Sequence, residues 1–362
     1  MAHKTDRLDS RLVAIHAIMA SRGVEALLFL DIKNIRYLTG FSGSDAALLV
    51  SENQTVLLVD GRYTTQARKQ TRRIRVFEYR EKAAGIAQVA SGLRVKTLGF
   101  EAAAITYEFY AILLKKLRNI KLRAVTDDHL GGLRSIKSGR EIAFIKKAVQ
   151  ISTQALEAVL PLVKPGVQES DIALELHYRI RQQGAEGLAF EAIVASGENA
   201  ALPHAKPGSR RIKKGDLVVI DFGAVYGGYH SDETCTFGIG RLNRSQKKAY
   251  ETVKEAHDRA LDAIRAGVAC REIDGIARGC IEKRGYGKYF SHGTGHGIGL
   301  DVHEAPRLSI ASNGALQHGM VVTVEPGIYI PGQWGIRLED SVLVKKGGYE
   351  VLTRIPKDLT IL

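Results

Sequence analysis

The sequence predicts two domains, an α/β domain over residues 1–132 and an α+β domain over residues 137–362. Three observations support this prediction. The chain has 362 residues, which is about twice the length of a typical domain. Helix and strand signals alternate through the first third, whereas the remainder repeats a unit of one helix and two strands. The contents of 45% hydrophobic and 25% charged residues are ordinary for a globular protein and exclude a disordered, collagen-like or disulfide-stapled chain.

The first domain is predicted to begin with an amphipathic helix at 7–21, where apolar residues recur at helical spacing. Short apolar runs predict buried strands at 26–30, 46–50 and 55–59. The turn signal Asp60-Gly61-Arg62 precedes a further helix, and another helix is predicted at 107–117. A helix that begins at Gly139 and reaches Ala148 is expected to join the two domains.

The second domain contains two copies of one unit, offset by 101 residues. Gly166 opens a helical segment that ends at Gly184, and Gly267 opens a segment that ends at Gly285. Each segment is followed by histidines and then by a pair of strands, predicted at 217–225 with 229–237 and at 320–330 with 335–344. A duplicated unit of this kind has a pseudo-two-fold repeat and brings matching points of its two hairpins toward one pocket.

Four carboxylates follow this repeat. Asp221 and Asp232 lie in the two strands of the first hairpin, and Glu325 and Glu339 lie in the two strands of the second. Asp221 and Glu325 are 104 residues apart, which is close to the offset of the helices. A carboxylate within an apolar strand is costly unless it is paired or bound to a cation. The pattern therefore indicates a cation site.

Histidines complete the pattern, because His292, His296 and His303 fall within 12 residues. Glycine occupies every second position from 293 to 299, which permits close backbone approach and unusual dihedral angles. A phosphate-binding loop is not supported, since no Gly-Lys-Ser/Thr motif or βαβ unit accompanies these glycines. One imidazole with four carboxylates suits Mn²⁺, Co²⁺, Fe²⁺ or Zn²⁺. Five ligands fit two ions about 3.5–4 Å apart with a bridging hydroxide.

The chain resembles the pita-bread metallopeptidases, and among them the Xaa-Pro peptidases aminopeptidase P and prolidase. The matching segments are VVIDFGAVYGGYHSDETCTF, HGTGHGIGLDVHE, VVTVEPGIY and GIRLED. The creatinase-type N-terminal domain of the same enzymes is similar to NIRYLTGFSGSDAALLV and VLLVDGRYTTQA. The resemblance covers nearly the whole chain and implies a creatinase-like domain at 1–132 and a pita-bread catalytic domain at 137–362.

The resemblance implies two divalent metal ions, most often Mn²⁺, with Co²⁺, Fe²⁺ or Zn²⁺ as alternatives. The implied ligands are Asp221, Asp232, His296, Glu325 and Glu339. In such a site Asp232 and Glu339 bridge the two ions, or nearly so. Glu325 also helps to hold or deprotonate the metal-bound water.

Four other residues take expected roles from the resemblance. His204 matches a histidine that lines the scissile bond, and His303 matches one that donates to the carbonyl oxygen or the tetrahedral intermediate. His292 matches an outer histidine near the proline pocket. Arg337 matches a supporting arginine and shares a strand face with Glu339, two residues further on.

The implied reaction is hydrolysis of the Xaa-Pro bond of short peptides by a metal-bridging hydroxide, whose formation near neutral pH the two ions favour. The nitrogen of this bond carries no hydrogen, so recognition depends on shape and apolar contact. Glu325 or His204 is expected to protonate the leaving nitrogen. Aminopeptidase and dipeptidase action both remain open.

Alternative functions stay on the same fold. A creatinase-like hydrolase that acts on a non-peptide substrate does not use the metals, and a catalytically inactive binding module is expected to have lost several ligands, yet all five are intact. Methionine aminopeptidases generally lack the N-terminal domain. One departure from the family concerns Cys235, because the family often has Thr-Arg-Thr where this chain has Thr234-Cys235-Thr236. A missing salt bridge and an altered substrate rim are both consistent with this departure.

The net charge of +13 is concentrated in the first domain. Residues 1–136 hold 22 basic and 13 acidic residues, whereas residues 137–362 hold 30 and 26. The densest basic run, at 68–75, lacks interleaved aromatic residues, so a solvated face is expected rather than nucleic-acid binding. Three cysteines without a CxxC pair and an N-terminus without a signal peptide predict a cytoplasmic protein. A homodimer is expected, with no nucleic-acid or membrane partner.

Overall fold

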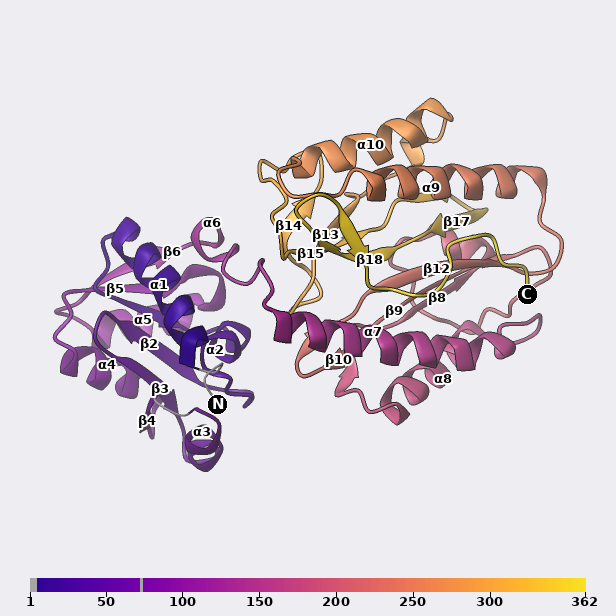
Figure 1. Ribbon diagram of the computed structural model, residues 1–362. Coiled ribbons are helices and arrows are strands. Elements are labelled where there is room, and N and C mark those ends of the chain that lie inside the picture. The colour runs from indigo at the N-terminus through magenta and orange to yellow at the C-terminus, as the bar shows by residue number, and fades with distance from the viewer. Residues whose placement is uncertain (1–4, 72–73) are drawn as a thin grey trace. The chain divides into compact units, whose positions relative to one another are not determined.

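The computed structural model describes residues 5–71 and 74–362, and the chain divides into two compact units, Met1–Leu133 and Arg134–Leu362 (Figure 1). Arg72 and Arg73, which belong to the predicted basic face, lie outside the described residues. Within the part of the chain that is described, no helix combines the length and the apolar composition that crossing a membrane requires.

The first unit is built on a six-stranded mixed sheet with the order β4-β3-β2-β1-β5-β6. Its strands are β1 (Ala26–Phe29), β2 (Ala47–Ser51), β3 (Thr55–Val59), β4 (Arg75–Glu78), β5 (Thr97–Glu101) and β6 (Lys121–Val125). Its helices are α1 (Thr5–Arg22), α2 (Ile32–Thr39), α3 (Thr64–Gln70), α4 (Lys82–Gly92), α5 (Tyr107–Lys116) and α6 (Asp127–Leu130). Leu28, Leu49 and Leu58 are fully buried between the sheet and Ile86 of α4. The predicted α/β architecture is confirmed.

The second unit holds two layers of helices with strands between them. Its helices are α7 (Gly139–Val159), α8 (Glu169–Gln182), α9 (Arg244–Asp262) and α10 (Cys270–Lys283). Its first set of strands is β7 (Gly187–Leu188), β8 (Ile193–Ser196), β9 (Leu217–Phe222), β10 (Ala224–Tyr226), β11 (Tyr229–His230) and β12 (Glu233–Gly238). The second set is β13 (Gly295–Gly297), β14 (Glu304–Leu308), β15 (Val321–Val324), β16 (Gly327–Ile330), β17 (Trp334–Arg337), β18 (Asp340–Val344) and β19 (Tyr349–Val351). In Figure 1, α7 and α8 lie along one side of these strands and α9 and α10 along the other.

The expectation that the helix at 139–148 joins the two domains is wrong. This helix, α7, extends to Val159 and lies wholly within the second unit. A capping box between Ser138 and Glu141 sets its first turn. Its apolar face, which includes Ile151 and Leu156, is buried in one core with the residues of α8, β9 and β12. The helix is therefore part of the second unit and not a linker, because its apolar side needs that core to be covered.

The internal repeat is visible in the backbone itself. Helices α8 and α10 both begin three residues after a glycine and end two residues before another glycine. The φ angles are +93° at both Gly166 and Gly267, and +92° and +84° at Gly184 and Gly285. Only glycine adopts such angles at low cost, so the four residues on which the repeat was based have matching conformational roles.

Each predicted hairpin is interrupted at the same place, where it passes from one sheet to another. In the first repeat β9 pairs with β12, whereas β10 pairs with β11. In the second repeat β15 pairs with β18, whereas β16 pairs with β17. The breaks come at Gly223, where an added Cβ would lie 2.0 Å from the Ser231 carbonyl oxygen, and at Pro326, which has no N–H for a ladder. The prediction of continuous strands there was wrong. Asp221 and Glu325 lie within two residues of these breaks, and Asp232 and Glu339 directly precede the returning strands β12 and β18.

Candidate metal centre

The four predicted carboxylates come together with His296 in the middle of the second unit. Asp221 lies near the end of β9 and Asp232 directly precedes β12. Glu325 directly follows β15, and Glu339 directly precedes β18. His296 lies in β13, which pairs with β15. The Nε2 atom of His296 is 3.3 Å from Glu325 Oε1 and 3.6 Å from Asp232 Oδ2.

Three of these residues form a compact donor group. One potential ligand atom from each of Asp232, His296 and Glu339 lies within 4.8 Å of the other two, and all three residues are buried. The Nδ1 atom of His296 is 3.0 Å from the Gly297 carbonyl oxygen. This contact orients the ring so that Nε2 faces the acids, as a hydrogen bond on the far nitrogen commonly does for metal-binding histidines.

Hydrogen bonds between the two repeats hold the acids in register. The Thr234 hydroxyl donates to Glu339 Oε2 over 2.7 Å, and the Glu339 N–H donates to the Thr234 carbonyl oxygen over 3.0 Å. From the second repeat, the Ser341 hydroxyl donates to the Asp232 carbonyl oxygen over 2.8 Å. Each ligand strand is thus fixed by a residue of the other repeat.

The electrostatics of this cluster favour a bound cation. Burial raises the pKa of Asp221, Asp232 and Glu339, and the neighbouring carboxylates raise it further. Burial also opposes ionisation of Glu325, but the hydrogen bond and charge of His296 lower the pKa of Glu325 to about 2. Buried like charges cannot all ionise without a counter-charge, so a cation at this cluster would offset their repulsion.

Two unpartnered oxygens show that divalent ions fit this cluster. Within the described residues, the buried atoms Asp221 Oδ1 and Glu339 Oε1 have no hydrogen-bond partner. A buried carboxylate oxygen without a donor costs free energy, and a hard or borderline cation supplies the missing interaction. The donor set of carboxylates and one imidazole therefore suits metal ions.

Arg337 is buried and forms an ion pair with Asp221. Its Nη2 atom lies 2.6 Å from Asp221 Oδ2, and its Nη1 donates to the Tyr329 hydroxyl over 2.9 Å and to the Pro203 carbonyl oxygen over 3.1 Å. The Nε group donates to the Thr234 hydroxyl over 3.2 Å. Arg337 thus orients one carboxylate and ties the segment before His204 to the centre.

Tyr329 is a residue that the sequence reasoning missed. Its hydroxyl lies 2.9 Å from His292 Nε2 as well as 2.9 Å from Arg337 Nη1. Burial raises the pKa of Tyr329 to about 12 and lowers the pKa of His292, so both groups are neutral near pH 7. The only local signal is a tyrosine on the buried strand β16 just after Glu325, and that signal does not separate a packing residue from a functional one.

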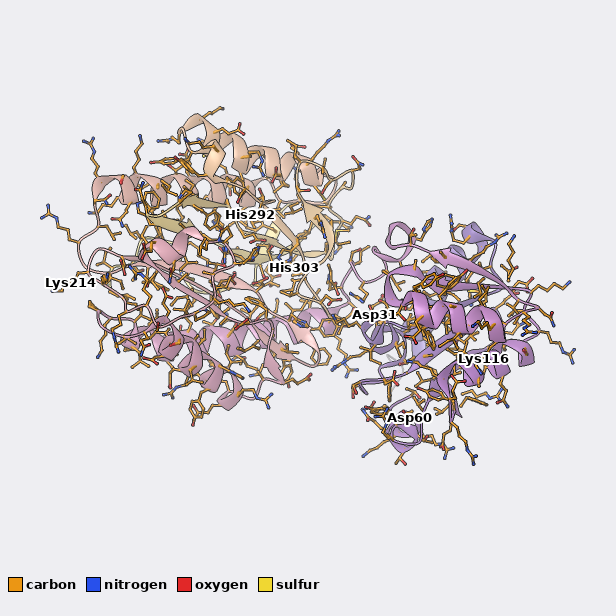
Figure 2. All side chains as sticks on the ribbon, turned by 180° about the vertical axis from the view of Figure 1, so that it is seen from behind. Asp31, Asp60, Lys116, Lys214, His292 and His303 are labelled. Atoms are coloured by element: carbon orange, nitrogen blue, oxygen red, sulfur yellow. The ribbon has the colours of Figure 1, made fainter. Side chains whose placement is uncertain are left out.

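His303 and His204 are exposed side chains beside the buried cluster. The rings of His303 and His296 meet edge to face with their centroids 4.3 Å apart. Burial and the charge of His296 lower the pKa of His303, and His204 also lowers the pKa values of His303 and His292. Figure 2 labels His292 and His303 in the second unit.

The loop that carries His303 is anchored by ion pairs. Arg134 lies 2.7 Å from Asp301 and 2.9 Å from Glu304, and the buried Lys137 lies 3.1 Å from Glu304. His303 stands between these two acids in the chain. These contacts fix the position of a histidine that otherwise faces solvent.

The glycines around His296 allow close packing. An added Cβ at Gly295 would lie 2.0 Å from the Thr323 carbonyl oxygen, and one at Gly297 would lie 2.3 Å from the Ala305 carbonyl oxygen. The expected close backbone approach is confirmed, whereas none of the alternating glycines from 293 to 299 has a positive φ. Strand β13 can therefore insert between its neighbours and present His296.

Two family models match the chain. Residues 143–346 match the metallopeptidase family M24, and residues 11–136 match the creatinase/prolidase N-terminal domain. The first match covers more than half of the chain. The chain belongs to metallopeptidase family M24. Membership implies divalent metal ions, in keeping with the buried Asp232, His296 and Glu339 group.

Relatives of this M24 chain match over its full length. An uncharacterised peptidase of Bacillus subtilis is 38% identical over 97% of this chain and 100% of its own length. A protein of Pyrococcus horikoshii named Xaa-Pro dipeptidase is 38% identical over 98% of this chain and 99% of its own length. These relatives share both domains with the M24 chain.

Solved structures confirm the creatinase-like and pita-bread architecture. A structure described as an Xaa-Pro dipeptidase from Bacillus anthracis has a TM-score of 0.95 at 38% identity, covering 98% of this chain and 100% of its own. A structure described as an X-Pro aminopeptidase from Thermotoga maritima has a TM-score of 0.87 at 36% identity, covering 96% and 100%. Neighbours with both names therefore share the fold of this M24 chain.

Proposed function

We propose that this chain is a two-metal exopeptidase that hydrolyses the Xaa-Pro bond of short peptides. The observation that carries the metallopeptidase part is the buried cluster of four carboxylates and His296, in which Asp221 Oδ1 and Glu339 Oε1 lack a partner among the described residues. The Xaa-Pro preference is supported by the full-length relatives named for that activity.

The proposed metal ligands are Asp221, Asp232, His296, Glu325 and Glu339. Asp232 and Glu339, which the family resemblance implies as shared ligands, both belong to the compact buried group with His296. Mn²⁺ is the proposed ion, with Co²⁺, Fe²⁺ and Zn²⁺ as alternatives. When bound, such ions lower the pKa of coordinated water and polarise a carbonyl group.

The surrounding side chains take the remaining roles. Glu325 is the proposed group that accepts a proton from the attacking water, because its carboxyl lies within the cluster, 3.3 Å from His296 Nε2. His303 is exposed next to His296 and is the proposed donor to the substrate carbonyl oxygen. His204 is proposed to line the scissile bond of the bound peptide. Arg337 positions Asp221.

The leaving nitrogen of an Xaa-Pro bond has no hydrogen, so the proline must be recognised by shape and apolar contact. His292 lies next to Phe290 and Tyr329, with ring centroids 5.1 and 5.5 Å away. This group of rings is the proposed wall against the proline. Glu325 or His204 then returns a proton to the leaving nitrogen.

A peptide panel tests the proposal. The chain is stripped of metal, loaded with Mn²⁺, Co²⁺ or Zn²⁺ in turn, and given Xaa-Pro, Xaa-Pro-Yaa and matched Xaa-Ala peptides. We expect cleavage of the proline peptides only, with loss of the cleavage in Asp232→Asn and no loss in Glu175→Gln, which alters a half-buried ion pair on α8.

The products decide between the two activities. Cleavage confined to dipeptides identifies a dipeptidase, whereas release of the first residue from tripeptides identifies an aminopeptidase. No cleavage of any proline peptide with any of the metals overturns the proposal. Light scattering on the same samples tests the expected homodimer.

A further inference from the structure

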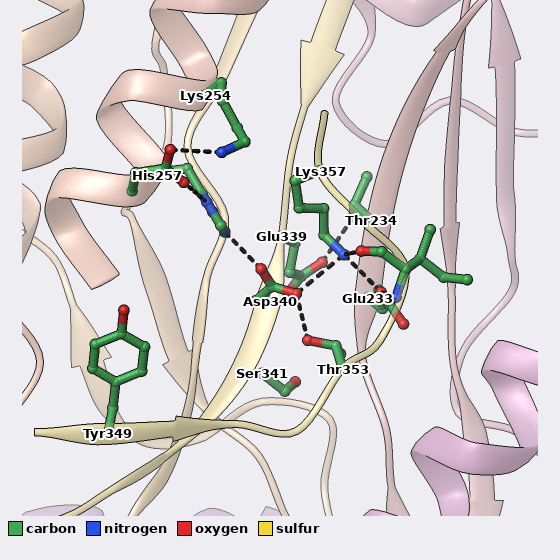
Figure 3. Close-up of polar contacts among 12 residues, drawn as sticks. Glu233, Thr234, Lys254, His257, Glu339, Asp340, Ser341, Tyr349, Thr353 and Lys357 are labelled. Carbon is green, nitrogen blue, oxygen red and sulfur yellow. Dashed lines mark hydrogen bonds and ion pairs between the residues drawn. The ribbon is translucent and has the colours of Figure 1, made fainter. Parts of the chain in front are cut away.

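A second buried polar cluster lies next to the strands that carry the proposed ligands, and Figure 3 shows its polar contacts. Its centre is the ammonium group of Lys357, whose side chain is only 4% exposed. Lys357 Nζ lies 2.6 Å from Glu233 Oε1 and 3.1 Å from Asp340 Oδ1, and it donates to the Ile355 carbonyl oxygen over 2.8 Å.

The two carboxylates of this cluster are direct neighbours of proposed metal ligands. Glu233 follows Asp232, and Asp340 follows Glu339. Adjacent residues at a strand point to opposite faces. In each repeat, one carboxylate therefore points to the metal centre and the carboxylate of the following residue points to Lys357. The single ammonium group of Lys357 thus contacts both repeats.

Lys357 comes from the C-terminal segment, which is fixed along β12. The Tyr250 hydroxyl donates to the Lys357 carbonyl oxygen over 3.1 Å, and the Ile355 N–H donates to Glu233 Oε1 over 3.1 Å. The N–H of Leu362 donates to the Gly238 carbonyl oxygen over 2.8 Å. These contacts hold the lysine in place along the strand.

Cys235 lies on the same face of β12 as Glu233, two residues further on, and it is 2% exposed. Glu233 contacts Lys357 Nζ over 2.6 Å, so the Cys235 side chain points to the same side of β12 as the ammonium group. A basic side chain at position 235 would therefore extend toward the same two carboxylates. Lys357 therefore lies in the region that a basic side chain at position 235 would reach.

We propose that Lys357 is a positioning residue for both metal ions, acting through Glu233 and Asp340 on the strands that carry Asp232 and Glu339. Its positive charge lies between two buried carboxylates, of which Asp340 also lies 3.2 Å from His257 Nε2, and it takes the place that a basic residue at 235 would fill. Removing one partner of a buried ion pair leaves an uncompensated charge. The two strands then shift to separate Glu233 from Asp340, and their ligands move with them.

The inference rests on the proposed metal centre, and metal binding to the unmodified chain is measured first. Mn²⁺ is titrated into metal-free protein by calorimetry, and the spectrum of the loaded centre is recorded by electron paramagnetic resonance. If the unmodified chain binds no Mn²⁺, the proposed function fails together with this inference. If it binds Mn²⁺ and cleaves peptides, the variants test the inference alone.

The decisive variants are K357M, K357R and the double variant C235R/K357M, with K254M as the control. Lys254 also forms an ion pair in this region, at 2.6 Å from Asp258, but its partner is not adjacent to a ligand. We expect K357M to bind at least one Mn²⁺ ion with an affinity at least tenfold lower. Its electron paramagnetic resonance spectrum should differ from that of the unmodified chain, and kcat should fall by a larger factor than KM rises. K357R and C235R/K357M are expected to regain Mn²⁺ affinity to within threefold, and K254M to resemble the unmodified chain.

Two outcomes overturn the inference. One is a folded K357M that keeps Mn²⁺ affinity within threefold and an unchanged spectrum, even if its melting temperature is lower, because that result shows a purely structural lysine. The other is a C235R/K357M variant that does not regain affinity. If K357M fails to fold, the double variant decides alone: folding with two Mn²⁺ ions bound supports the inference, and any other result overturns it.

Discussion

Glu325 differs from the other three acids of the metal centre. Its carboxyl lies 3.3 Å from His296 Nε2, and this contact keeps its pKa at about 2 despite burial. Burial raises the pKa values of Asp221, Asp232 and Glu339 instead. The contact with His296, and not the residue type, therefore sets Glu325 apart from the other three acids.

The Glu325→Gln substitution tests the proposed role of Glu325 as the proton acceptor. Glutamine keeps an oxygen ligand but cannot accept a proton, so Xaa-Pro hydrolysis is expected to fall by about 10²–10⁴-fold. Mn²⁺ content measured by mass spectrometry serves as the control and is expected to stay near that of the unmodified chain. Activity within tenfold of the unmodified chain, with both ions bound, would show that another group is the base.

Helix α9 and strand β18 are joined by a buried ion pair in the cluster of Figure 3. The ring of His257 is 1% exposed and lies 3.2 Å from Asp340 through Nε2 and 3.2 Å from Asp258 through Nδ1. Burial lowers the pKa of His257, as does the charge of Lys357, but the two carboxylates raise it above 6.5 overall. Asp340, with a pKa of about 2, stays ionised near neutral pH.

The stability of the chain should therefore depend on pH through His257. Because its pKa is higher in the folded than in the unfolded state, the charged ring stabilises the fold fully below pH 6.5. This contribution is lost as pH rises through the folded-state pKa. Urea unfolding of the unmodified chain and of His257→Gln is expected to show a larger difference in unfolding free energy at pH 6 than at pH 9. An equal difference at both pH values would contradict the assignment.

At the scale of the whole molecule, all five proposed ligands lie in the unit Arg134–Leu362. A ligand that binds only the folded state stabilises it by about 2.7 kcal/mol at a concentration 100 times its Kd. The stabilisation should be confined to the unit that contains the site.

Hydrogen exchange measures whether Mn²⁺ stabilises only the unit that contains the site. On adding Mn²⁺ to metal-free protein, we expect slower exchange in peptides that cover β9, β12, β13, β15 and β18, and unchanged exchange across residues 26–125. Protection of the first unit equal to that of the second would contradict the prediction. Asp232→Asn serves as the control, because it should abolish most of the effect.

Local chemistry made much of the fold predictable from the sequence. Apolar runs predicted β1, β2 and β3 within a residue or two at either end, since buried strands need continuous apolar side chains. The glycines at 166, 184, 267 and 285 predicted the repeat, because positive φ angles demand them. The sheet changes at Gly223 and Pro326 were missed, because strand pairing depends on residues far away in the chain.

The sequence by itself determined that this chain holds a repeated pair of acidic hairpins with a histidine-rich segment, and hence a candidate cation site. Only the tertiary structure decided that Tyr329 joins His292 to Arg337, and that Lys357 faces Glu233 and Asp340. The physical reason is that a carboxylate ligand within an apolar strand is visible in the local sequence, because a buried charge there is costly unless it is paired. A lysine in a C-terminal segment leaves none until the fold buries it between two strands whose acids lie 107 residues apart.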